Sequence, residues 1–299
     1  MTSDTRLIKH PLLPYAAILT AALFWGSSFA AMKVTITALG PWSVMWFRMA
    51  AALLVILPFA HKLWPRNYRP GDWRLLLSFV AFQPCLYFAL ESNALRFTTS
   101  SQAGLIAASV PIMVALGAHL FLHEKVSRET VAGLFISLGG VVWLTLAGSP
   151  SEMAVDPLLG NTLELGAMMS AVGYVLLVKK LTERYDPWTL TAMQIAAGFL
   201  FFSPGARFFL SGGFLALTTV QLLTLLYLGA CVTLGAFGLY NVGIRSIPAN
   251  RATALVNLVP VIAVVLGWGL LDERLNGSQI MAAMCVLAGV WLSQRRGAA

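Results

Sequence analysis

Four ionisable side chains of this sequence lie within or at the ends of long apolar runs. They are Lys33, Arg48, Glu91 and Glu164. A charge in an apolar environment is costly unless it is paired or hydrated, so this placement indicates a functional role. One interpretation is two ion pairs that latch one side of the molecule. The other makes Glu91 a proton-coupling carboxylate beside Arg48 or Lys33, unless Arg48 extends to the surface instead.

Two prolines interrupt apolar runs near their middles. Pro111 and Pro260 each remove one backbone donor and free the carbonyl four residues earlier, which belongs to Ala107 or Val256. A free carbonyl in an apolar environment is tolerated where a neighbour bonds it or where it faces a wet cavity. The prolines therefore predict either a cavity between their two segments or a packing kink in each.

Aromatic and polar side chains share the depth of these prolines in other runs. Aromatic faces suit the apolar part of an amphiphilic small molecule, and hydroxyls and amides replace the water that its polar groups lose. For any single aromatic residue, facing lipid is the alternative. The predicted binding residues are Trp25, Ser27, Ser28, Gln83, Tyr87, Phe88, Ala107, Pro111, Tyr174, Thr233, Phe237, Asn257 and Pro260.

The composition excludes an ordinary soluble domain. Of the 299 residues, 58% are hydrophobic and only 11% are charged, whereas soluble domains carry about 25% charged residues. Cys85, Cys231 and Cys285 lie in apolar runs without metal-ligand spacing, so we expect no disulfide framework, metal site or cofactor. The formal charge of +8 does not indicate nucleic acid, because the basic residues lie at the ends of runs instead of forming one stripe.

The apolar runs predict ten transmembrane helices and therefore an all-α, polytopic membrane protein. A span takes about 20 residues, so ten spans leave room only for short loops. The runs lack the period-two alternation of barrel strands, which leaves helices as the spanning structure. The predicted spans are 14–36, 41–60, 75–95, 99–122, 130–147, 161–181, 188–210, 221–244, 249–271 and 279–293.

The basic residues predict the orientation of these spans. With the N-terminus in the cytoplasm, fifteen of the 20 Lys and Arg residues lie on the cytoplasmic side and four lie outside, which satisfies the positive-inside rule. Both termini are then cytoplasmic, and the short loops favour the inner membrane of a bacterium. On this topology the four ionisable residues named first all lie in the outer half of the bilayer.

The same pattern occurs twice, which divides the chain into residues 1–150 and 151–299. At an offset of 149 residues, Val110-Pro111 recurs as Val259-Pro260 and Glu124-Lys125 as Glu273-Arg274; at an offset of 146, Lys33 recurs as Lys179. Each copy holds five spans, an odd number, so the second copy enters the membrane in the opposite sense. Secondary transporters use such inverted repeats and bind substrate between the halves. Glu124 and Glu273, which end the fourth and ninth spans, are expected to cap and brace the hairpins to the next helices.

The repeated motifs resemble a known family. They are Trp25-Gly26-Ser27-Ser28-Phe29, Ala103-Gly104-Leu105, Ser109-Val110-Pro111, Phe121-Leu122-His123-Glu124-Lys125 and Gly139-Gly140. With their second copies, they resemble the repeat of the EamA-type drug/metabolite transporters over essentially the whole chain. The resemblance implies a ten-helix exporter of small metabolites, amino acids or drugs. It also implies a central cavity lined mainly by the first, third, fourth, sixth, eighth and ninth helices.

Three readings of the function compete. An exporter of amino acids or similar amphiphilic metabolites, working by alternating access as a possible monomer in the lipid bilayer, is the first. Multidrug efflux is the runner-up, because aromatic and methionine side chains also suit drugs. A scaffold without transport explains the hydrophobicity but gives no reason for polar residues and prolines at mid-depth. No nucleophile elbow, P-loop or metal motif indicates an enzyme.

Overall fold

The computed structural model describes residues 12–63, 65, 67–122, 127–247, 252 and 255–294. In this part of the chain nearly all regular structure is helical, with one isolated β-bridge between Ser151 and Ala154. The prediction of an all-α fold is confirmed.

The helices follow the predicted spans in order. In the first repeat they are α1 (Leu13–Leu39), α2 (Pro41–Ile56), α3 (Asp72–Val80), η3 (Ala81–Leu86), α4 (Tyr87–Phe97), α5 (Ser100–Ala107), α6 (Val110–Leu122) and α7 (Arg128–Leu146). In the second repeat they are α8 (Pro157–Leu181), α9 (Pro187–Phe201), α10 (Ala206–Leu210), α11 (Thr219–Tyr227), η6 (Leu228–Ala236), α12 (Phe237–Ser246), α14 (Leu258–Leu271) and α15 (Gly277–Gln294).

Not all of these helices have the length of a membrane span. Among the described residues, seven helical stretches are long and apolar enough to cross a bilayer, and the bent segment from α9 to α10, with its angle of 56°, makes up to eight. The apolar helices α14 and α15 are shorter. The chain is therefore a multi-pass membrane protein, and the number of ten spans stays a prediction.

Polar side chains define where several helices begin. Each accepts a hydrogen bond from a backbone N–H of the first turn, which otherwise has no intrahelical partner. These N-cap residues are Thr99 for α5, Ser127 for α7, Asp156 for α8, Asp186 for α9 and Thr218 for α11. The polar residues in the short loops between apolar helices thus mark where the next helix begins.

Four spans are interrupted, and the interruptions are related by the repeat. The third span contains a π-helical segment in which Gln83 has non-helical angles (φ −148°, ψ 120°), and the eighth contains the π-helical segment Leu228–Ala236. The fourth span breaks between Ala107 and Val110, and at the equivalent place α14 begins after Asn257. The sequence predicted continuous helices here, with at most a proline kink. Such breaks re-aim side chains and often lie at functional sites.

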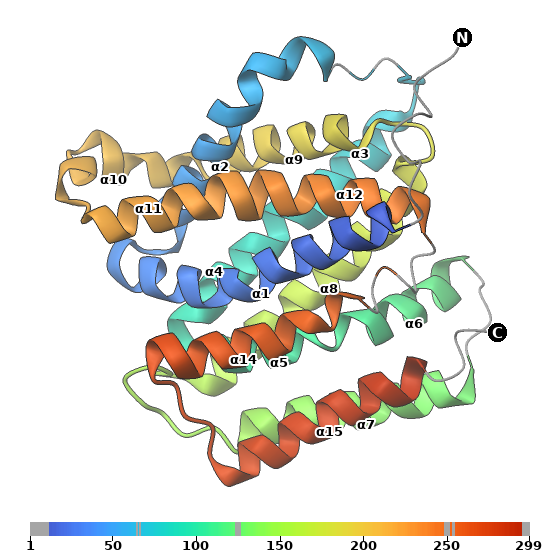
Figure 1. The fold of residues 1–299 in the computed structure, drawn as a ribbon, viewed down its shortest axis with the longest axis vertical. Coiled ribbons are helices and arrows are strands. Elements are labelled where there is room, and N and C mark those ends of the chain that lie inside the picture. The colour runs from blue at the N-terminus through green and yellow to red at the C-terminus, as the bar shows by residue number, and fades with distance from the viewer. Residues whose placement is uncertain are drawn as a thin grey trace.

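The helices run roughly parallel to one another in layers (Figure 1). α7 and α15, the last helices of the two repeats, pack together at one end of the molecule. There a Cβ on Gly133 or Gly289 would overlap backbone atoms of the other helix, so the absence of side chains permits the close approach. α1, α4, α5, α8 and α14 lie in the middle, and this central layer positions the candidate site.

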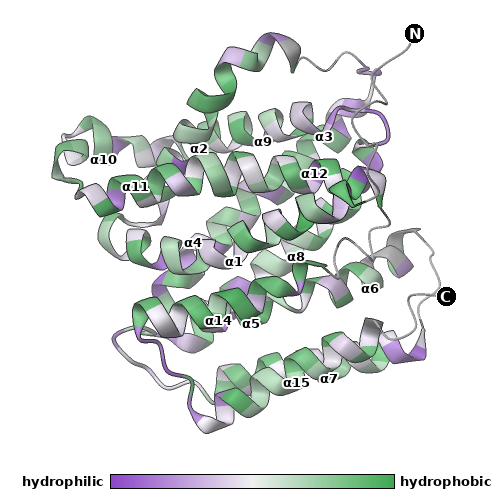
Figure 2. Cartoon of the chain, viewed as in Figure 1, coloured by the Kyte–Doolittle hydropathy of each residue, from purple (hydrophilic) through white to green (hydrophobic). Residues whose placement is uncertain are grey.

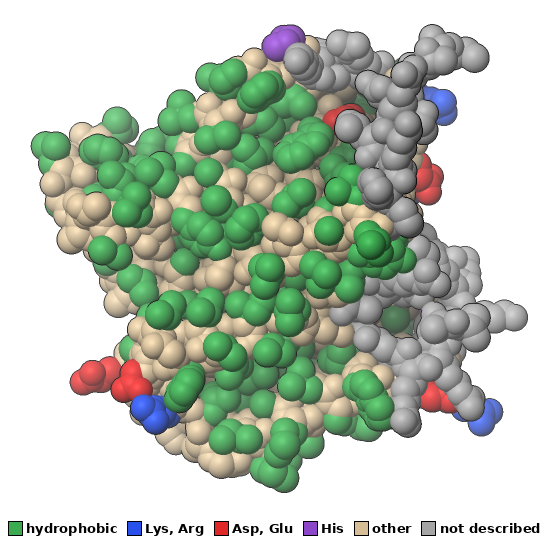
Figure 3. Space-filling view, viewed as in Figure 1, with side chains coloured by type: hydrophobic (Ala, Val, Ile, Leu, Met, Phe, Trp, Pro, Cys, Tyr) green, Lys and Arg blue, Asp and Glu red, His purple; other side chains and the backbone are tan. Residues whose placement is uncertain are grey.

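The surface has the pattern of a membrane protein. Hydrophobic residues follow the helices along their length, and hydrophilic ones gather toward the helix ends (Figure 2). On the face shown in Figure 3, the described Lys, Arg, Asp and Glu side chains lie toward the left and right ends of the molecule, and none appears in the middle. The broad apolar band between these ends is the surface that lipid would cover.

Candidate functional site

A cavity of about 80 Å³ lies in the central layer, between the two repeats. α1, α2, η3, α4, α5 and α6 contribute side chains from the first repeat, and α8, α12 and the segment 256–259 contribute them from the second. The lining residues are Trp25, Ser28, Phe29, Arg48, Gln83, Tyr87, Phe88, Glu91, Ala107, Val110, Pro111, Met168, Ala171, Tyr174, Val175, Phe237, Tyr240, Val256 and Val259.

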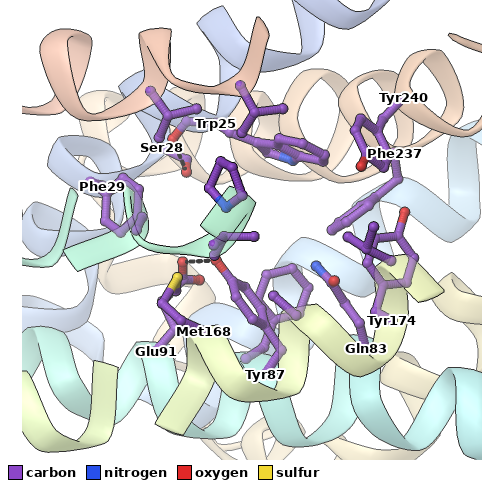
Figure 4. A pocket seen from close by; sticks show the side chains of 18 of the residues that line it. Trp25, Ser28, Phe29, Gln83, Tyr87, Glu91, Met168, Tyr174, Phe237 and Tyr240 are labelled. Carbon is purple, nitrogen blue, oxygen red and sulfur yellow. Dashed lines mark hydrogen bonds between the residues drawn. The ribbon is translucent and has the colours of Figure 1, made fainter. Parts of the chain in front are cut away.

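Most of the residues predicted for binding line this cavity. They are Trp25, Ser28, Gln83, Tyr87, Phe88, Ala107, Pro111, Tyr174 and Phe237. The breaks in the helices put several of them there: Gln83 lies at the non-helical residue of η3, and Ala107 and Pro111 lie on either side of the gap between α5 and α6. Figure 4 shows Trp25 and Ser28 on one side of the cavity, with Gln83, Tyr87 and Glu91 on the other.

Four predicted residues do not line it. Ser27 points into a different groove, where its hydroxyl lies 2.5 Å from that of Tyr227. Thr233 is buried behind the wall and bonds Arg48. Pro260 is buried in α14, and Asn257 precedes that helix with its Oδ1 buried and without a hydrogen bond. A helix turns by 100° per residue, so neighbours in sequence, such as Ser27 and Ser28, face different environments.

Aromatic rings form one wall of the cavity. The ring of Trp25 lies 5.5 Å from that of Phe237 and 5.0 Å from that of Tyr240, centre to centre, in tilted arrangements. The Phe237 ring also packs edge-on against Phe88 and Tyr174, at 5.9 and 6.2 Å. The contacts fix the rings against one another, so the wall offers a rigid apolar surface to a ligand.

The expected ion pairs among the four intramembrane charges are absent. Arg48 forms no ion pair with Glu91 or Glu164, and neither does Lys33. Instead, the Arg48 side chain, 1% exposed, donates from Nε to Thr233 Oγ1 and from Nη1 to Met32 Sδ, at 3.1 Å for the sulfur contact. The alternative that Arg48 extends to the surface is wrong as well, because Arg48 shares the buried face of α2 with Met45 and Met49.

The two carboxyl groups also differ from expectation. Glu91 lines the cavity, and its Oε1 accepts a hydrogen bond of 2.5 Å from the Tyr87 hydroxyl one turn earlier on α4. Glu164 is fully buried on α8, which packs against α4, and neither of its oxygens has a hydrogen-bond partner. A polar group that is buried without a hydrogen-bond partner is costly.

Lys33 binds backbone instead of a carboxylate. Its Nζ donates to the carbonyls of Leu95, Thr98 and Met153 at 2.8, 2.8 and 2.7 Å. The repeat-related Lys179 donates to the carbonyls of Ile244 and Ile247 at 2.9 and 3.2 Å. These carbonyls occupy equivalent positions, 149 residues after Leu95 and Thr98. Lys33 therefore ties α1 to the end of α4, and Lys179 ties α8 to the end of α12.

Glu273 caps a helix, but not the one expected. Its carboxylate accepts four hydrogen bonds of 2.6 to 3.0 Å from the backbone N–H and hydroxyl groups of Ser100 and Ser101, at the start of α5. The sequence predicted a brace within its own hairpin, whereas the contact joins the second repeat to the first. The equivalent Glu124 lies outside the described residues.

Several lining residues were missed in the sequence. Phe29 follows Trp25 by one helical turn, Tyr240 follows Phe237 by three residues, and Met168 precedes Tyr174 by six. Extending the helical period from the predicted residues would have found the first two. Val110, Ala171, Val175 and Val259 carry no signal of their own, because small apolar residues occur on every face of these helices.

The EamA-like transporter family matches the chain twice, over residues 12–146 and 158–294. The chain belongs to this family. The resemblance noted in the sequence is confirmed, and the EamA-like segments coincide with the two copies of the repeated pattern.

Relatives support the same assignment. The uncharacterized transporter YetK of Bacillus subtilis is 26% identical over 96% of this chain and 88% of its own, and the uncharacterized transporter YcxC of the same organism is 27% identical over 95% and 94%. A probable terminal-alkyne amino-acid exporter of Streptantibioticus cattleyicolor is 22% identical over 94% and 93%. A crystal structure of another protein has the same fold, with a TM-score of 0.64 at 17% identity over 96% of this chain and 98% of that one.

Proposed function

We propose that this EamA-like transporter exports small amphiphilic metabolites, with amino acids as the first candidates, across the inner membrane of a bacterium. The observation that carries the proposal is the central cavity, which combines an aromatic wall with the polar side chains of Ser28, Gln83 and Tyr87 and with two charged groups. A ligand with an apolar part and several polar atoms is complementary to this mixture.

The size of the cavity favours a metabolite over a typical drug. A water molecule needs about 10–15 Å³ of such space, so a cavity of about 80 Å³ holds roughly five to eight waters. At about 30 Å³ of liquid per water, this corresponds to roughly 150–240 Å³, the bulk of one compound with about ten non-hydrogen atoms. The name of the Streptantibioticus relative, a probable amino-acid exporter, points the same way.

Alternating access is the proposed mechanism, with residues 1–150 and 151–299 as the two halves that rock about the cavity in inverted orientation. The interrupted third, fourth, eighth and ninth spans supply places where backbone can adjust. The basic residues support cytoplasmic termini. No covalent chemistry and no cofactor enter this proposal, and one copy of the chain suffices for one cavity.

Transport by the purified protein in liposomes tests the function. Labelled leucine and phenylalanine are followed in counterflow with and without an imposed pH gradient, against protein-free liposomes and the Trp25→Ala variant. Saturable amino-acid movement that the variant weakens supports the proposal. Movement of cationic dyes without any amino acid would replace it by multidrug efflux, and movement of no solute would replace it by a scaffold.

A further inference from the structure

The guanidinium of Arg48 is buried at the cavity with too few acceptors. Its only bonds to described residues are those to Thr233 Oγ1 and to the Met32 sulfur, which is a weak acceptor. A guanidinium offers five N–H donors in a planar fork, so three donors remain without an acceptor. The group that this fork binds best is a carboxylate, through two parallel hydrogen bonds.

Glu91 supplies the opposite chemistry in the same cavity. Its side chain is 3% exposed, and Tyr87 occupies one of its oxygens at 2.5 Å. The other oxygen, Oε2, accepts no hydrogen bond from the described residues. Figure 4 shows the Glu91 carboxyl group directed into the space beside Ser28 and Phe29. A carboxylate with a free oxygen in such a space is an acceptor for an ammonium group.

Arg48 and Glu91 do not pair with each other in the cavity. They form no ion pair with each other, and the Arg48 guanidinium lies over the Phe88 ring at 4.3 Å from its centre. Phe88 belongs to α4, three residues before Glu91. Each charge therefore keeps its free hydrogen-bonding positions for a ligand that lies against the wall formed by Phe88 and its neighbours.

Building on the proposed function, we propose that Arg48 and Glu91 form a zwitterion site. Arg48 binds the carboxylate of an amino acid, Glu91 binds its ammonium group, and the rings of Trp25, Phe237 and Tyr240 contact its apolar side chain. One positive and one negative group together disfavour ligands with a single charge, because an amine leaves Arg48 unpaired and an acid leaves Glu91 unpaired. The site thus selects for charge as well as size.

Thr233 is a positioning residue in this arrangement. Its hydroxyl accepts from Arg48 Nε and donates to the carbonyl of Leu228 at 2.9 Å, a bond that spans five residues of the π-helical segment η6. The interrupted helix therefore orients the guanidinium fork. Thr233→Val removes this orientation without touching the ligand, whereas Thr233→Ser retains the hydroxyl.

Competition in counterflow tests the zwitterion site. The competitors against labelled phenylalanine are phenylalanine, phenethylamine and 3-phenylpropionate, which share the ring and differ in charge. In the wild type, the amine and the acid should each need at least about tenfold higher concentration than phenylalanine, as loss of one charge-assisted contact implies. Arg48→Gln should selectively narrow the gap for the amine, that is, the ratio of the competing concentration of phenethylamine to that of phenylalanine. Glu91→Gln should selectively narrow the corresponding gap for the acid, 3-phenylpropionate. Thr233→Val should narrow the gap for the amine as Arg48→Gln does. Thr233→Ser, which retains the hydroxyl, should keep the gap of the wild type.

Matched controls and outcomes separate this inference from the proposed function. Arg207→Gln and Glu152→Gln change the same residue types at exposed positions and should leave both gaps unchanged. Equal losses for all three competitors in the Arg48 and Glu91 variants, while the wild type transports amino acids, would overturn the zwitterion site alone. A wild type that moves no amino acid would overturn both. Size-exclusion profiles identify misfolded variants, and the milder Arg48→Lys, which lacks the fork, then replaces Arg48→Gln.

Discussion

Glu273 offers the clearest test of how the two repeats are held together at the side predicted to be extracellular. The substitution Glu273→Gln keeps the size of the side chain but removes its charge. In the structure, Oε2 accepts from the backbone N–H of Ser101 and from two hydroxyls, and Oε1 accepts from the backbone N–H of Ser100. The amide oxygen of the glutamine can accept from the Ser100 N–H, and the amide NH2 group can donate to both hydroxyls once these have rotated to accept. The NH2 group then also faces the Ser101 N–H, and this donor loses its acceptor.

The magnitude follows from these contacts. Loss of a charge-assisted hydrogen bond to a buried donor costs about 1.5–3 kcal/mol, and loss of a negative charge at the start of α5 costs about 0.3–1 kcal/mol more. The closed state at this side should therefore lose about 2–4 kcal/mol. Because 1.4 kcal/mol corresponds to a factor of ten, its population relative to the open state should fall roughly 30-fold or more.

Cysteine accessibility measures this shift. The native cysteines are replaced, Met168 on the cavity wall is changed to cysteine, and a membrane-impermeant thiol reagent is added from outside. Labelling should accelerate in Glu273→Gln by about the same factor. Asp272→Asn is the control, because the Asp272 carboxylate is 81% exposed and, among the residues that the structure describes, bonds only the exposed Arg274. Equal labelling rates in wild type and Glu273→Gln would refute the idea that this contact holds the repeats closed.

Three further predictions concern other contacts. Lys179→Met should lower the thermal unfolding midpoint, because the Lys179 ammonium group binds two backbone carbonyls. Lys180→Met, at an exposed position, is the control and should leave the midpoint unchanged. Fluorescence-detected size exclusion after heating compares the two variants. Asp72→Asn should speed labelling of the cavity from the side predicted to be cytoplasmic, because Asp72 accepts hydrogen bonds from Arg184 and Tyr185 of the other repeat at 2.6 and 2.5 Å. Burial and this bond raise the pKa of the Tyr185 hydroxyl to about 12, so the contribution of Tyr185 is present below the normal tyrosine pKa of about 10 and is lost as the pH rises through about 12. Each labelling rate rises with the thiolate fraction of the cysteine, but the ratio of the rates in Asp72→Asn and wild type should not change between pH 6 and 9. Ser27→Ala should leave the apparent affinity for substrate within about twofold, since the Ser27 hydroxyl faces a groove outside the cavity and surface changes away from a site have small effects.

Local sequence signals were sufficient for the helices and for much of the cavity wall. Apolar runs that end at polar N-caps define most helices within a few residues, as for α8 between Pro157 and Leu181. Polar residues at mid-depth and prolines in repeat-related positions identify the segments that meet at the cavity, and Tyr87 and Tyr174 line it. Both signals are local, because each residue's own neighbours in sequence report its depth in the bilayer.

Partners of charged residues could not be predicted in the same way. Lys33 was expected to pair with a carboxylate, yet carbonyls from three separate places satisfy it, and nothing in the sequence marks a carbonyl as free. The interruption at Gln83 depends on how η3 packs against α8 and α9, although Pro84 within the run gave a hint. Contacts between distant segments decide these features, and hydrophobic periodicity does not report them.

The third acceptor of Lys33 has a consequence for how the protein is made. Met153 lies in the connection between the repeats, beyond residue 150, so the first half has all three carbonyls for its buried ammonium group only after this connection has been synthesised. When only the first five spans have been synthesised, the Met153 carbonyl that binds Lys33 Nζ is therefore still missing. For the same reason, a gene split to express the halves separately should be cut after Met153, so that the first fragment contains all three carbonyls that bind Lys33.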